Sequence, residues 1–423
     1  MLTAIVGINW GDEGKGRMVD LLSEEQDIIV RYQGGNNAGH TVINERGKFV
    51  LNLLPSGILR PDKVNVMGNG MVVDVEHLAK ETARLREAGV AISPDNLKIS
   101  DRAVICFPYN VKQDCLEEDR LGDKKFGSTR RGIAPIYADK YMKKAVRMGD
   151  LLQPEYLRAR LETVLDWKNL CLSAYGAGNE YTVESMLEWL EKYGAQFKPY
   201  VCDTGAYLTE AAEQGKRIMF EAQLGALRDI DFGIYPYTSS SNTVSAYAPV
   251  GAGVPNLKID KTVGIMKAYS TCVGEGPFTA EMFGQEAHEL REAGGEYGAA
   301  TGRPRRVGGF DVVASKYGCR VQAADEIALT KLDILDGLDE ITVVDSYEID
   351  GETVTEFPMG ERLNRAKPHV VKFKGWKKST CACRKFEELP AEAQAYVEYI
   401  EKAVGVYVKY VSVGAERESI IVR

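Results

Sequence analysis

The sequence predicts an α/β protein with a mostly parallel central sheet covered by helices and a phosphate-loop NTPase-like turn near its start. Three observations support this prediction. Apolar, β-branched segments alternate with helical patterns along the 423 residues, which is typical of parallel sheets covered on both faces. A glycine-rich turn joins the first strand-like segment to a helix-like one. Further glycine-rich, polar turns follow later strand segments, where ligands bind in α/β sheets.

The expected elements follow one another along the whole chain. Residues 2–8 predict the first strand and residues 18–22 the first helix. Further strands are expected at residues 27–32, 49–54, 64–66, 217–221, 327–332, 340–344 and 406–411. Helices are expected at residues 75–88 (between the cap Asp74 and Gly89), 157–167, 182–193, 310–323 and 391–404. We expect one domain over residues 1–423, with residues 108–215 as a helix-rich insertion or cap over the sheet.

The composition excludes several classes of protein. The net charge is −8, which argues against non-specific binding of nucleic acid or of anionic membranes. There is no apolar run of membrane-spanning length and no signal-peptide pattern, so we expect a cytoplasmic protein. Of the eight cysteines only Cys381 and Cys383 are close together. That pair lacks two further ligands nearby, so we expect no zinc site.

The turn Gly7-Ile-Asn-Trp-Gly-Asp-Glu-Gly-Lys-Gly-Arg17 is the most informative segment. Backbone N–H groups and the start of a helix make such a turn a phosphate site. The usual pattern, G-x-x-x-x-G-K-[ST], is broken where Asn9 replaces the first glycine and Gly16 replaces the magnesium-binding hydroxyl. In exchange the turn carries Asp12 and Glu13. We expect Lys15 to face phosphate and Asp12 to bind a metal or move a proton; the alternative is a solvated salt bridge in a surface turn.

Two further short sequences extend the hypothesis to GTP. His40 closes a polar turn, Asn37-Ala-Gly-His40, and a histidine that titrates near neutral pH suits a general acid beside phosphate. Thr330-Lys-Leu-Asp333 resembles the N/T-K-x-D guanine-binding sequence of GTP-binding proteins. A fixed carboxylate there accepts hydrogen bonds from guanine N1–H and the 2-amino group, and adenine offers neither donor.

Two arginine-rich loops indicate a second anionic substrate. They are Thr301-Gly-Arg-Pro-Arg-Arg306 and Gly127-Ser-Thr-Arg-Arg-Gly132. Guanidinium groups capture carboxylate or phosphate through paired hydrogen bonds. Together these features predict an enzyme that transfers a phosphoryl group from GTP to an oxygen, with Asp12 and His40 as an acid–base pair.

Several longer motifs, in the same order along essentially the whole chain, resemble the adenylosuccinate synthetase family. They are Trp10-Gly-Asp-Glu-Gly-Lys-Gly16, Arg31-Tyr-Gln-Gly-Gly35, Asn37-Ala-Gly-His-Thr41, Pro55-Ser-Gly-Ile58, Asp229-Ile-Asp231, Tyr235-Pro-Tyr237, Lys267-Ala-Tyr-Ser270 and Thr330-Lys-Leu-Asp-Ile-Leu-Asp-Gly337.

The resemblance implies a GTP- and Mg²⁺-dependent ligase of purine biosynthesis, which joins IMP and L-aspartate to adenylosuccinate through a 6-phosphoryl intermediate. It implies that Asp12 takes the N1 proton of IMP, that His40 supports phosphoryl transfer, and that Asp12 and the Gly39 carbonyl bind Mg²⁺. It also implies a homodimer in which Lys143 reaches the IMP site of the partner.

The family motifs also imply the composition of each binding site. The catalytic set is Asp12, Lys15, His40 and Gln223. The GTP site comprises Gly11, Asp12, Glu13, Gly14, Lys15, Gly16, Arg17, Gly39, His40, Thr41, Arg305, Lys331, Leu332, Asp333, Ser412, Val413 and Gly414. The IMP site comprises Asp12, Glu13, Gly14, Lys15, Asn37, Ala38, Gly39, His40, Thr129, Lys143, Leu224, Ser239 and Arg303. The aspartate site comprises Ala299, Ala300, Thr301, Gly302, Arg303, Pro304 and Arg305.

The chain departs from the family pattern at three places. The family's Glu-Gly-Ala-Gln-Gly appears as Glu221-Ala-Gln-Leu-Gly225, so Leu224 stands where the glutamine that supports the 6-oxygen of IMP is expected. Either the loop shifts its register or Gln223 points away. Lys143 aligns with an arginine, which keeps the charge but loses the paired hydrogen bonds. Ser239 replaces a threonine and keeps the hydroxyl.

Two alternatives stay open. One is a relative that uses another purine nucleotide in place of IMP; such relatives lose the catalytic aspartate, and Asp12 is present. The other is a catalytically silent GTP-binding regulator. It would explain Leu224 but would not need Asp12, His40 and the arginine loop together.

Overall fold

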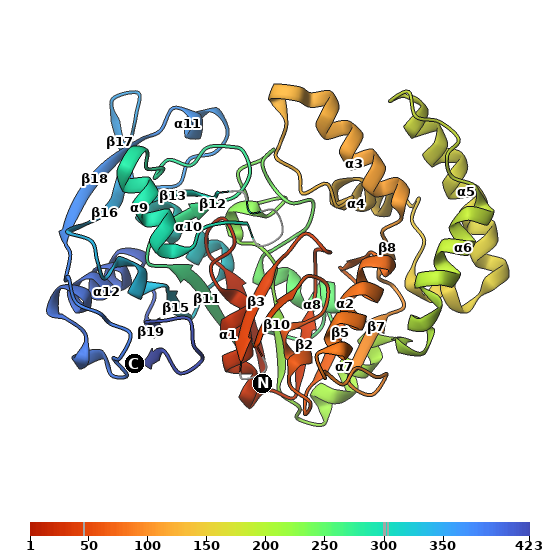
Figure 1. Ribbon diagram of the computed structural model, residues 1–423, viewed down its shortest axis with the longest axis horizontal. Coiled ribbons are helices and arrows are strands. Elements are labelled where there is room, and N and C mark those ends of the chain that lie inside the picture. Colours follow the sequence, from red (N-terminus) through yellow and green to blue (C-terminus); the bar gives the residue numbers. More distant parts are fainter. Residues whose placement is uncertain (45–46, 299–301, 303) are drawn as a thin grey trace.

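A ten-stranded sheet forms the centre of the computed structural model, which describes residues 1–44, 47–298, 302 and 304–423. Its strands are β1 (Leu2–Gly7), β2 (Ile28–Arg31), β5 (Val64–Met67), β7 (Leu97–Ser100), β9 (Val201–Cys202), β10 (Ile218–Glu221), β11 (Lys261–Lys267), β15 (Glu326–Thr330), β19 (Val408–Ser412) and β20 (Ile420–Val422). They lie in the order β20-β19-β15-β11-β1-β10-β2-β5-β7-β9, and every pair except β19–β20 is parallel (Figure 1). The prediction of a mostly parallel central sheet is confirmed.

Two of the expected strands form outside the central sheet. The segment at 49–54 becomes β4 (Gly47–Leu51), which makes an antiparallel hairpin with β3 (His40–Asn44). The segment at 340–344 becomes β16 (Glu340–Ile349), which pairs with β14 (Phe310–Asp311), β17 (Glu352–Val354) and β18 (Lys367–Lys374). Their partners β3, β17 and β18 are antiparallel and close in the chain, so this pairing needs no crossover, whereas β14 is parallel to β16.

The strand beside β1 was missing from the expected elements. β11 is buried along its length but begins and ends with lysine, which shortens its apolar run to a few residues. β1 itself is buried at all six positions, as expected for a central parallel strand. Two shorter pairs, β6 (Val72–Val73) with β8 (Val104–Ile105) and β12 (Ser270–Cys272) with β13 (Arg306–Gly308), extend the loops above the sheet.

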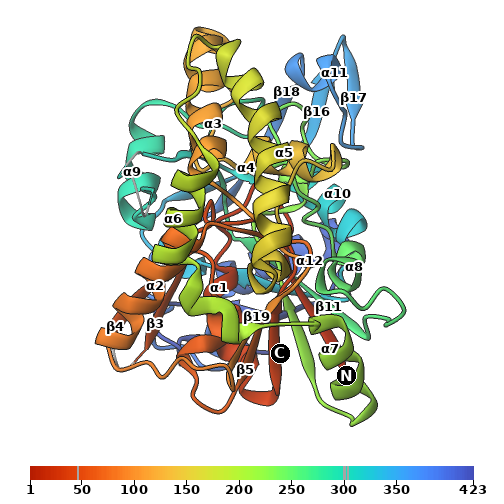
Figure 2. The same cartoon turned by 90° about the vertical axis from the view of Figure 1, so that its right-hand side faces the viewer.

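The helices lie on both sides of the sheet and beyond its β7–β9 edge (Figures 1 and 2). They are α1 (Lys15–Leu22), α2 (Val75–Glu87), α3 (Pro108–Leu121), α4 (Ile133–Tyr141), α5 (Pro154–Ser173), α6 (Val183–Tyr193), α7 (Thr204–Glu213), α8 (Ala248–Ala252), α9 (Gly284–Gly294), α10 (Val312–Gln322), α11 (Glu361–Asn364) and α12 (Ala391–Val404). The expected helices correspond to α1, α2, α5, α6, α10 and α12. The Asp74 side chain caps α2 by accepting from His77 N–H at 3.0 Å, as the sequence indicates.

Residues 108–215 contain more than a helical cap. Helices α3 to α6 occupy half of this segment, and α3 reaches the end of the molecule opposite both termini (Figure 2). The same segment also contains β9, which pairs with β7 and forms one edge of the central sheet. The insertion therefore contributes to the sheet itself. No helix in the described ranges has the length and apolar character needed to cross a membrane.

Helix α10 packs against the end of β1 and the turn that follows it. Gln322 Nε2 donates to Gly7 O at 3.0 Å, and Asn9 Nδ2 donates to Ser315 Oγ at 3.0 Å. A Cβ atom at Gly318 would lie 2.0 Å from Ile8 O, so only glycine permits this close approach. Asp311 caps the helix by accepting from Ala314 N–H at 2.9 Å, and Tyr347 donates its hydroxyl to the same carboxylate at 2.7 Å.

We predict that Asp311→Asn removes a pH-dependent loss of stability. Burial raises the pKa of Asp311 to about 6, although the hydrogen bonds that its carboxylate accepts oppose the shift. Between about pH 4 and pH 6 the unfolded chain releases this proton and the folded chain keeps it, so this group's contribution falls as pH rises. Asparagine keeps the cap. In urea titrations, the free energy of unfolding of the variant relative to that of the wild type should therefore rise by up to about 3 kcal/mol from pH 4 to pH 7. A difference that does not change with pH would contradict the assignment.

Candidate active site

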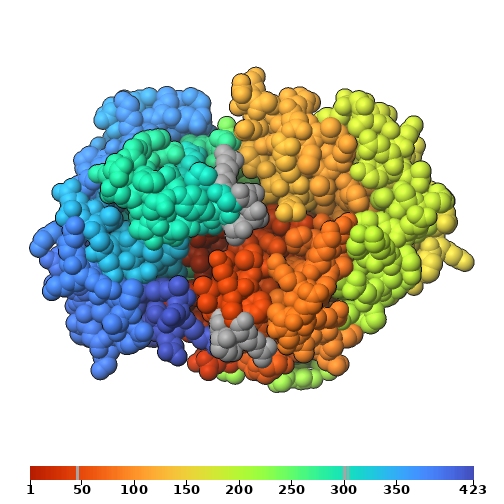
Figure 3. All heavy atoms as spheres, viewed as in Figure 1, coloured from red at the N-terminus to blue at the C-terminus, as the bar shows by residue number. Residues whose placement is uncertain are grey.

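A cavity of about 930 Å³ opens above the carboxyl ends of the central strands. The turns after β1, β2, β10, β15 and β19 all contribute to its lining, which is where ligands bind in open α/β sheets. In the space-filling view the part that carries α9 and the part that carries α3 lie on either side of the middle of this face (Figure 3). The cavity thus joins segments from both ends of the chain.

The Glu13 carboxylate stabilises the conformation of the turn that follows β1. Gly11, Asp12 and Gly14 have positive φ angles of 98°, 58° and 94°, a left-handed conformation that needs support at Asp12. The Glu13 carboxylate turns inward and accepts from Asn9 N–H at 3.1 Å and Gly11 N–H at 2.8 Å. Lys15 Nζ donates to its other oxygen at 2.5 Å, and both side chains are buried. Glu13 is therefore part of the loop's framework and does not line the cavity.

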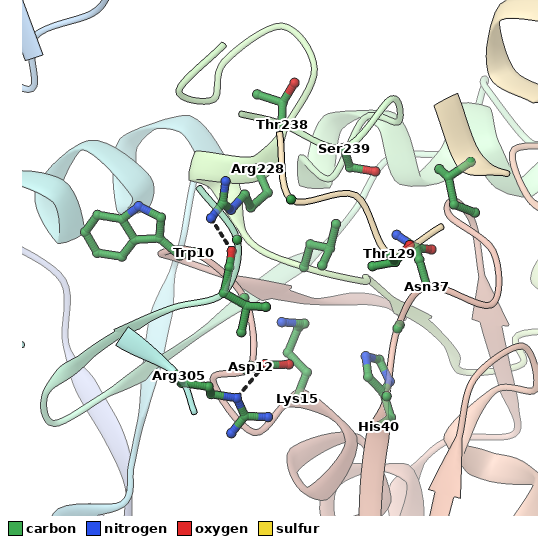
Figure 4. Close-up of a pocket in the computed structure, with 18 of the residues that line it drawn as sticks. Trp10, Asp12, Lys15, Asn37, His40, Thr129, Arg228, Thr238, Ser239 and Arg305 are labelled. Atoms are coloured by element: carbon green, nitrogen blue, oxygen red, sulfur yellow. Dashed lines mark hydrogen bonds and ion pairs between the residues drawn. The ribbon is translucent and has the colours of Figure 1, made fainter. Parts of the chain in front are cut away.

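Gly16 leaves no room for the hydroxyl residue of the usual phosphate loop. A Cβ atom at this position would lie 2.8 Å from Cβ of His40. Serine or threonine would force the first turn of α1 away from β3. The oxygen that the loop offers instead is that of Asp12, whose side chain is 34% exposed and faces the cavity (Figure 4).

Arg305 is the partner of Asp12. Its Nε lies 3.1 Å from Asp12 Oδ2, close enough for an ion pair but without the direction of a hydrogen bond. Its Nη1 donates to Glu296 at 2.7 Å. Arg305 thus lies between two carboxylates, one in the cavity and one behind its wall.

His40 is held by a buried carboxylate. Its Nδ1 lies 2.5 Å from Glu221 Oε1, and Ser56 donates to Glu221 from its backbone N–H at 2.8 Å and from its hydroxyl at 2.6 Å. Burial lowers the pKa of His40, and the hydrogen bond to Glu221 opposes that shift. Burial would raise the pKa of Glu221, but His40 and Arg31 lower it below its ordinary value overall. With Nδ1 bonded to this carboxylate, Nε2 is the ring nitrogen left for a ligand.

The turn after β15 lies against the first turn of the chain. Thr330 donates its hydroxyl to Glu13 O at 2.6 Å. Lys331, with a φ of 61°, and Asp333 both line the cavity. Burial raises the pKa of Asp333 above its ordinary value. Ser412 closes this end of the cavity and accepts from Arg17. The structure therefore places the expected guanine-binding residues next to the phosphate turn.

Gln223 does not reach the cavity. Its side chain is fully buried beneath the turn after β2, where its Nε2 donates to Gly35 O at 3.0 Å. Leu224 lines the cavity instead, with a φ of 60° and its side chain against Gly11. Of the two possibilities left open by the sequence, Gln223 points away. The catalytic contact expected of Gln223 is not made in this arrangement.

Arg228 is a residue of this site that the motifs did not indicate. Its guanidinium is buried in the cavity wall near Thr238 and Ser239 (Figure 4). It donates to the carbonyls of Val273 at 2.5 Å and Tyr237, and to Cys272 Sγ at 3.0 Å. An arginine next to the Asp229-Ile-Asp231 motif was the available signal. Arg228 joins the turn after β10 to the loop after β12.

Most of the expected site residues meet in this one cavity. Those that line it are Gly11, Asp12, Gly14, Lys15, Gly16, Arg17, Asn37, Ala38, Gly39, His40, Thr41, Thr129, Leu224, Ser239, Arg305, Lys331, Asp333, Ser412 and Gly414. Glu13, Leu332 and Val413 are buried behind it, and Lys143, Gly302 and Pro304 are exposed and not part of its lining. Ala299, Ala300, Thr301 and Arg303 lie outside the described residues.

The oxygen donors of the cavity suit a magnesium ion better than a zinc ion. No cluster of three or more His, Cys, Asp or Glu side chains that could hold a metal occurs in the part of the chain that the structure describes. Asp12 offers one carboxylate, and Gly39 is also part of the lining. Mg²⁺ at nucleotide sites is bound through one or two carboxylates together with phosphate oxygens.

Comparisons with known proteins give consistent results. The family model described as adenylosuccinate synthetase matches residues 4–421. Relatives named adenylosuccinate synthetase from Caldanaerobacter subterraneus subsp. tengcongensis and Streptococcus gordonii are 45% and 43% identical, over 100% and 98% of this chain and 99% and 96% of theirs.

Solved structures agree with the sequence matches. A fully ligated adenylosuccinate synthetase from Plasmodium falciparum is 35% identical with a TM-score of 0.93, covering 100% of this chain and 99% of its own. A cyanophage S-2L succinoaminodeoxyadenylate synthetase, 18% identical over 99% of this chain and 94% of its own, shares the fold with a TM-score of 0.61.

We predict that Glu221→Gln lowers the pKa of His40 further. Glutamine can still accept from Nδ1, but it removes the negative charge that favours the imidazolium form. The chain has four histidines, so the imidazole resonance can be followed by NMR titration. Asp345→Asn, which removes the carboxylate 2.7 Å from His369 Nδ1, is the matched control and should leave the His40 titration unchanged. An unchanged or raised pKa in Glu221→Gln would contradict this pairing.

Proposed function

The chain belongs to the adenylosuccinate synthetase family, and on that premise we propose how its residues carry out the family reaction. That reaction is the GTP-dependent ligation of IMP and L-aspartate to adenylosuccinate, and the chain is thus a ligase of purine biosynthesis. The observation that best supports a role for the cavity is that Asp12, His40, Lys331 and Asp333 line it together.

In our proposal Asp12 is the base for IMP. Its carboxylate accepts the proton of N1, and the 6-oxygen becomes anionic and attacks the γ-phosphorus of GTP. The bond between that phosphorus and the β,γ-bridging oxygen breaks, so GDP leaves and 6-phosphoryl-IMP forms. The amine of aspartate then attacks C6 and loses a proton, and phosphate leaves from C6. Asp12 is suited to the first step because it is the carboxylate of the phosphate turn that faces the cavity.

His40 supports phosphoryl transfer in this scheme. Its Nδ1 is held by Glu221, so the ring is fixed in place before any ligand arrives. Anionic phosphates next to Nε2 favour protonation of the ring, and the imidazolium can then donate a hydrogen bond to the transferring phosphoryl group. Lys15, buried beside Glu13, supplies a positive charge to the same phosphates.

Asp12 and the Gly39 carbonyl would hold Mg²⁺. When bound, the ion neutralises charge on the phosphates of GTP. This assignment explains why a loop without the usual hydroxyl can serve: Gly16 has no space for it, and Asp12 offers an oxygen on the cavity side.

The remaining assignments follow the lining of the cavity. Asp333 accepts from the N1–H and 2-amino groups of guanine, which selects GTP over ATP. Asn37, Thr129 and Ser239 line the side of the cavity away from Arg305 (Figure 4), and we assign them to IMP. Residues 299–305, with Arg303 and Arg305, bind the carboxylates of aspartate. Leu224 packs against the purine of IMP, and Gln223 acts only through the turn at Gly34 and Gly35.

We further propose a cytoplasmic homodimer in which each chain completes the IMP site of the other. Lys143 is exposed just after α4 and is not part of its own chain's cavity lining. Tyr141 and Met142 beside it are 69% and 50% exposed. A symmetric dimer that covers these side chains would bring Lys143 to the phosphate of IMP in the partner.

Phosphate release tests the proposed reaction. With GTP, IMP and aspartate present, phosphate and GDP should appear in equal amounts. Omitting IMP or aspartate, or replacing GTP by ATP, should lower the rate by at least about a hundredfold, because buried polar groups are then left unpaired or the acceptor is missing. Phosphate release that needs neither substrate would contradict the synthetase assignment. Turnover with a guanine nucleotide in place of IMP would support the alternative purine substrate.

Mixing two inactive variants tests the shared site. Asp12→Asn inactivates its own site but still offers Lys143, whereas Lys143→Ala has an intact Asp12 but offers no lysine. After random exchange, half of the dimers are mixed and each has one complete site, so about one quarter of wild-type activity should return. Each variant assayed alone at the same total concentration is the control. Activity equal to the mean of the separate variants would show that Lys143 does not act across the dimer.

A further inference from the structure

A buried carboxylate behind the cavity wall connects two parts of the proposed site. Glu296 follows α9 by two residues and is 0% exposed. Its environment is tightly packed, because a Cβ atom at Gly294 would lie 2.5 Å from the Tyr269 hydroxyl and 3.0 Å from Glu296 Cγ. The Glu296 side chain therefore packs closely against the end of α9 and against Tyr269.

Four side chains donate to this one carboxylate. At Oε1 it receives Lys267 Nζ at 2.8 Å, Lys331 Nζ at 2.6 Å and the Tyr269 hydroxyl at 2.5 Å. At Oε2 it receives Arg305 Nη1 at 2.7 Å. The Glu296 backbone carbonyl also accepts from Arg305 N–H at 2.9 Å. The four partners come from three segments, so Glu296 joins the ends of β11 and β15 to the segment before β13.

Glu296 forms ion pairs with all three cations of the cluster. Burial would raise the pKa of Glu296, but Lys267, Lys331 and Arg305 lower it well below its ordinary value. Burial also lowers the pKa of Lys267 to about 8, against the opposing charge of Glu296. Without this carboxylate, three cations would repel one another behind the cavity wall.

The two oxygens of Glu296 serve opposite ends of the site. Lys331, on Oε1, precedes Leu332 and Asp333 in the turn assigned to guanine. Arg305, on Oε2, continues to Asp12, with its Nε 3.1 Å from Oδ2. A chain of three contacts therefore runs from the guanine turn to the proposed base, and Glu296 is its centre.

We propose that Glu296 is a positioning residue that couples guanine recognition at Lys331 to the placement of Asp12 through Arg305. The inference rests on the proposed function, which assigns guanine to the turn after β15 and proton removal to Asp12. A displacement of Lys331 changes how Glu296 divides its hydrogen bonds, and Arg305 follows because its guanidinium and its backbone are both bonded to Glu296. A substitution in the turn assigned to guanine is thus expected to change the position of Asp12 as well as the affinity for GTP.

A double-mutant cycle with Glu296→Gln and Lys331→Met tests this coupling. At saturating GTP, each single substitution should lower kcat by about five- to tenfold, and the double variant should resemble the more affected single variant. A purely structural role for Glu296 would lower Tm, while the two effects on kcat would multiply as for independent sites. Multiplying effects would overturn the proposal.

Glu281→Gln is the matched control. Glu281 pairs with Arg306, the residue next to Arg305, at 2.9 and 2.5 Å, and makes no hydrogen bond or ion pair with Lys331 or Asp12 among the described residues. In this variant Lys331→Met should keep its full effect on kcat. If Lys331→Met no longer lowers kcat in the Glu281→Gln background, then removal of any nearby carboxylate has the same consequence. That result would contradict a specific role for Glu296.

Lys331→Met alone keeps the proposal testable if Glu296→Gln fails to fold. A fall in kcat together with a rise in the KM for GTP supports the link, and a rise in KM alone overturns it. Failure of the proposed function is distinguishable, because it would appear in the wild-type enzyme as phosphate release that does not need IMP and aspartate.

Discussion

The buried carboxylate of Glu13 is the interaction on which the rest of the site depends. It accepts two backbone N–H groups of its own loop and pairs with Lys15 at 2.5 Å. A charge in such surroundings is stable only with partners of this kind. Because Glu13 turns inward, the loop adopts left-handed angles that turn its neighbour Asp12 outward into the cavity. Glu13 thus stabilises the turn, and Asp12 is left free for the chemistry that we propose.

The same carboxylate explains why neighbouring segments approach so closely. Cβ atoms at Gly7 and Gly225 would lie 2.6 and 2.5 Å from its oxygens, so the turn after β10 packs directly on the loop. Thr330 bonds to the Glu13 carbonyl and brings the guanine turn to the other side. Glu296 then provides a second centre that joins this turn to Arg305. The regions proposed for phosphate, base and substrate are thereby parts of one packed unit.

Spacing and residue type in the sequence predicted those features of the structure that depend on residues close together in the chain. The strand, turn and helix around Asp12, the cap at Asp74 and the turn at Lys331 and Asp333 could be identified from spacing and residue type. Contacts between distant segments could not: Glu296 gathers partners from three segments, and Arg228 bonds to a loop that is 45 residues away. The family motif implied a glutamine contact, but only the packing of Gln223 beneath Gly35 shows that Leu224 takes the cavity side.

The central claim is that Asp12, freed by the inward turn of Glu13, removes the N1 proton of IMP before phosphoryl transfer. Positional isotope exchange in GTP measures this step without aspartate. With GTP labelled at the β,γ-bridging oxygen and IMP present, the wild type should scramble the label into non-bridging positions, because 6-phosphoryl-IMP forms reversibly. Asp12→Asn should bind GTP and IMP yet show no exchange above the level without IMP. Exchange at the wild-type rate in Asp12→Asn would contradict the account.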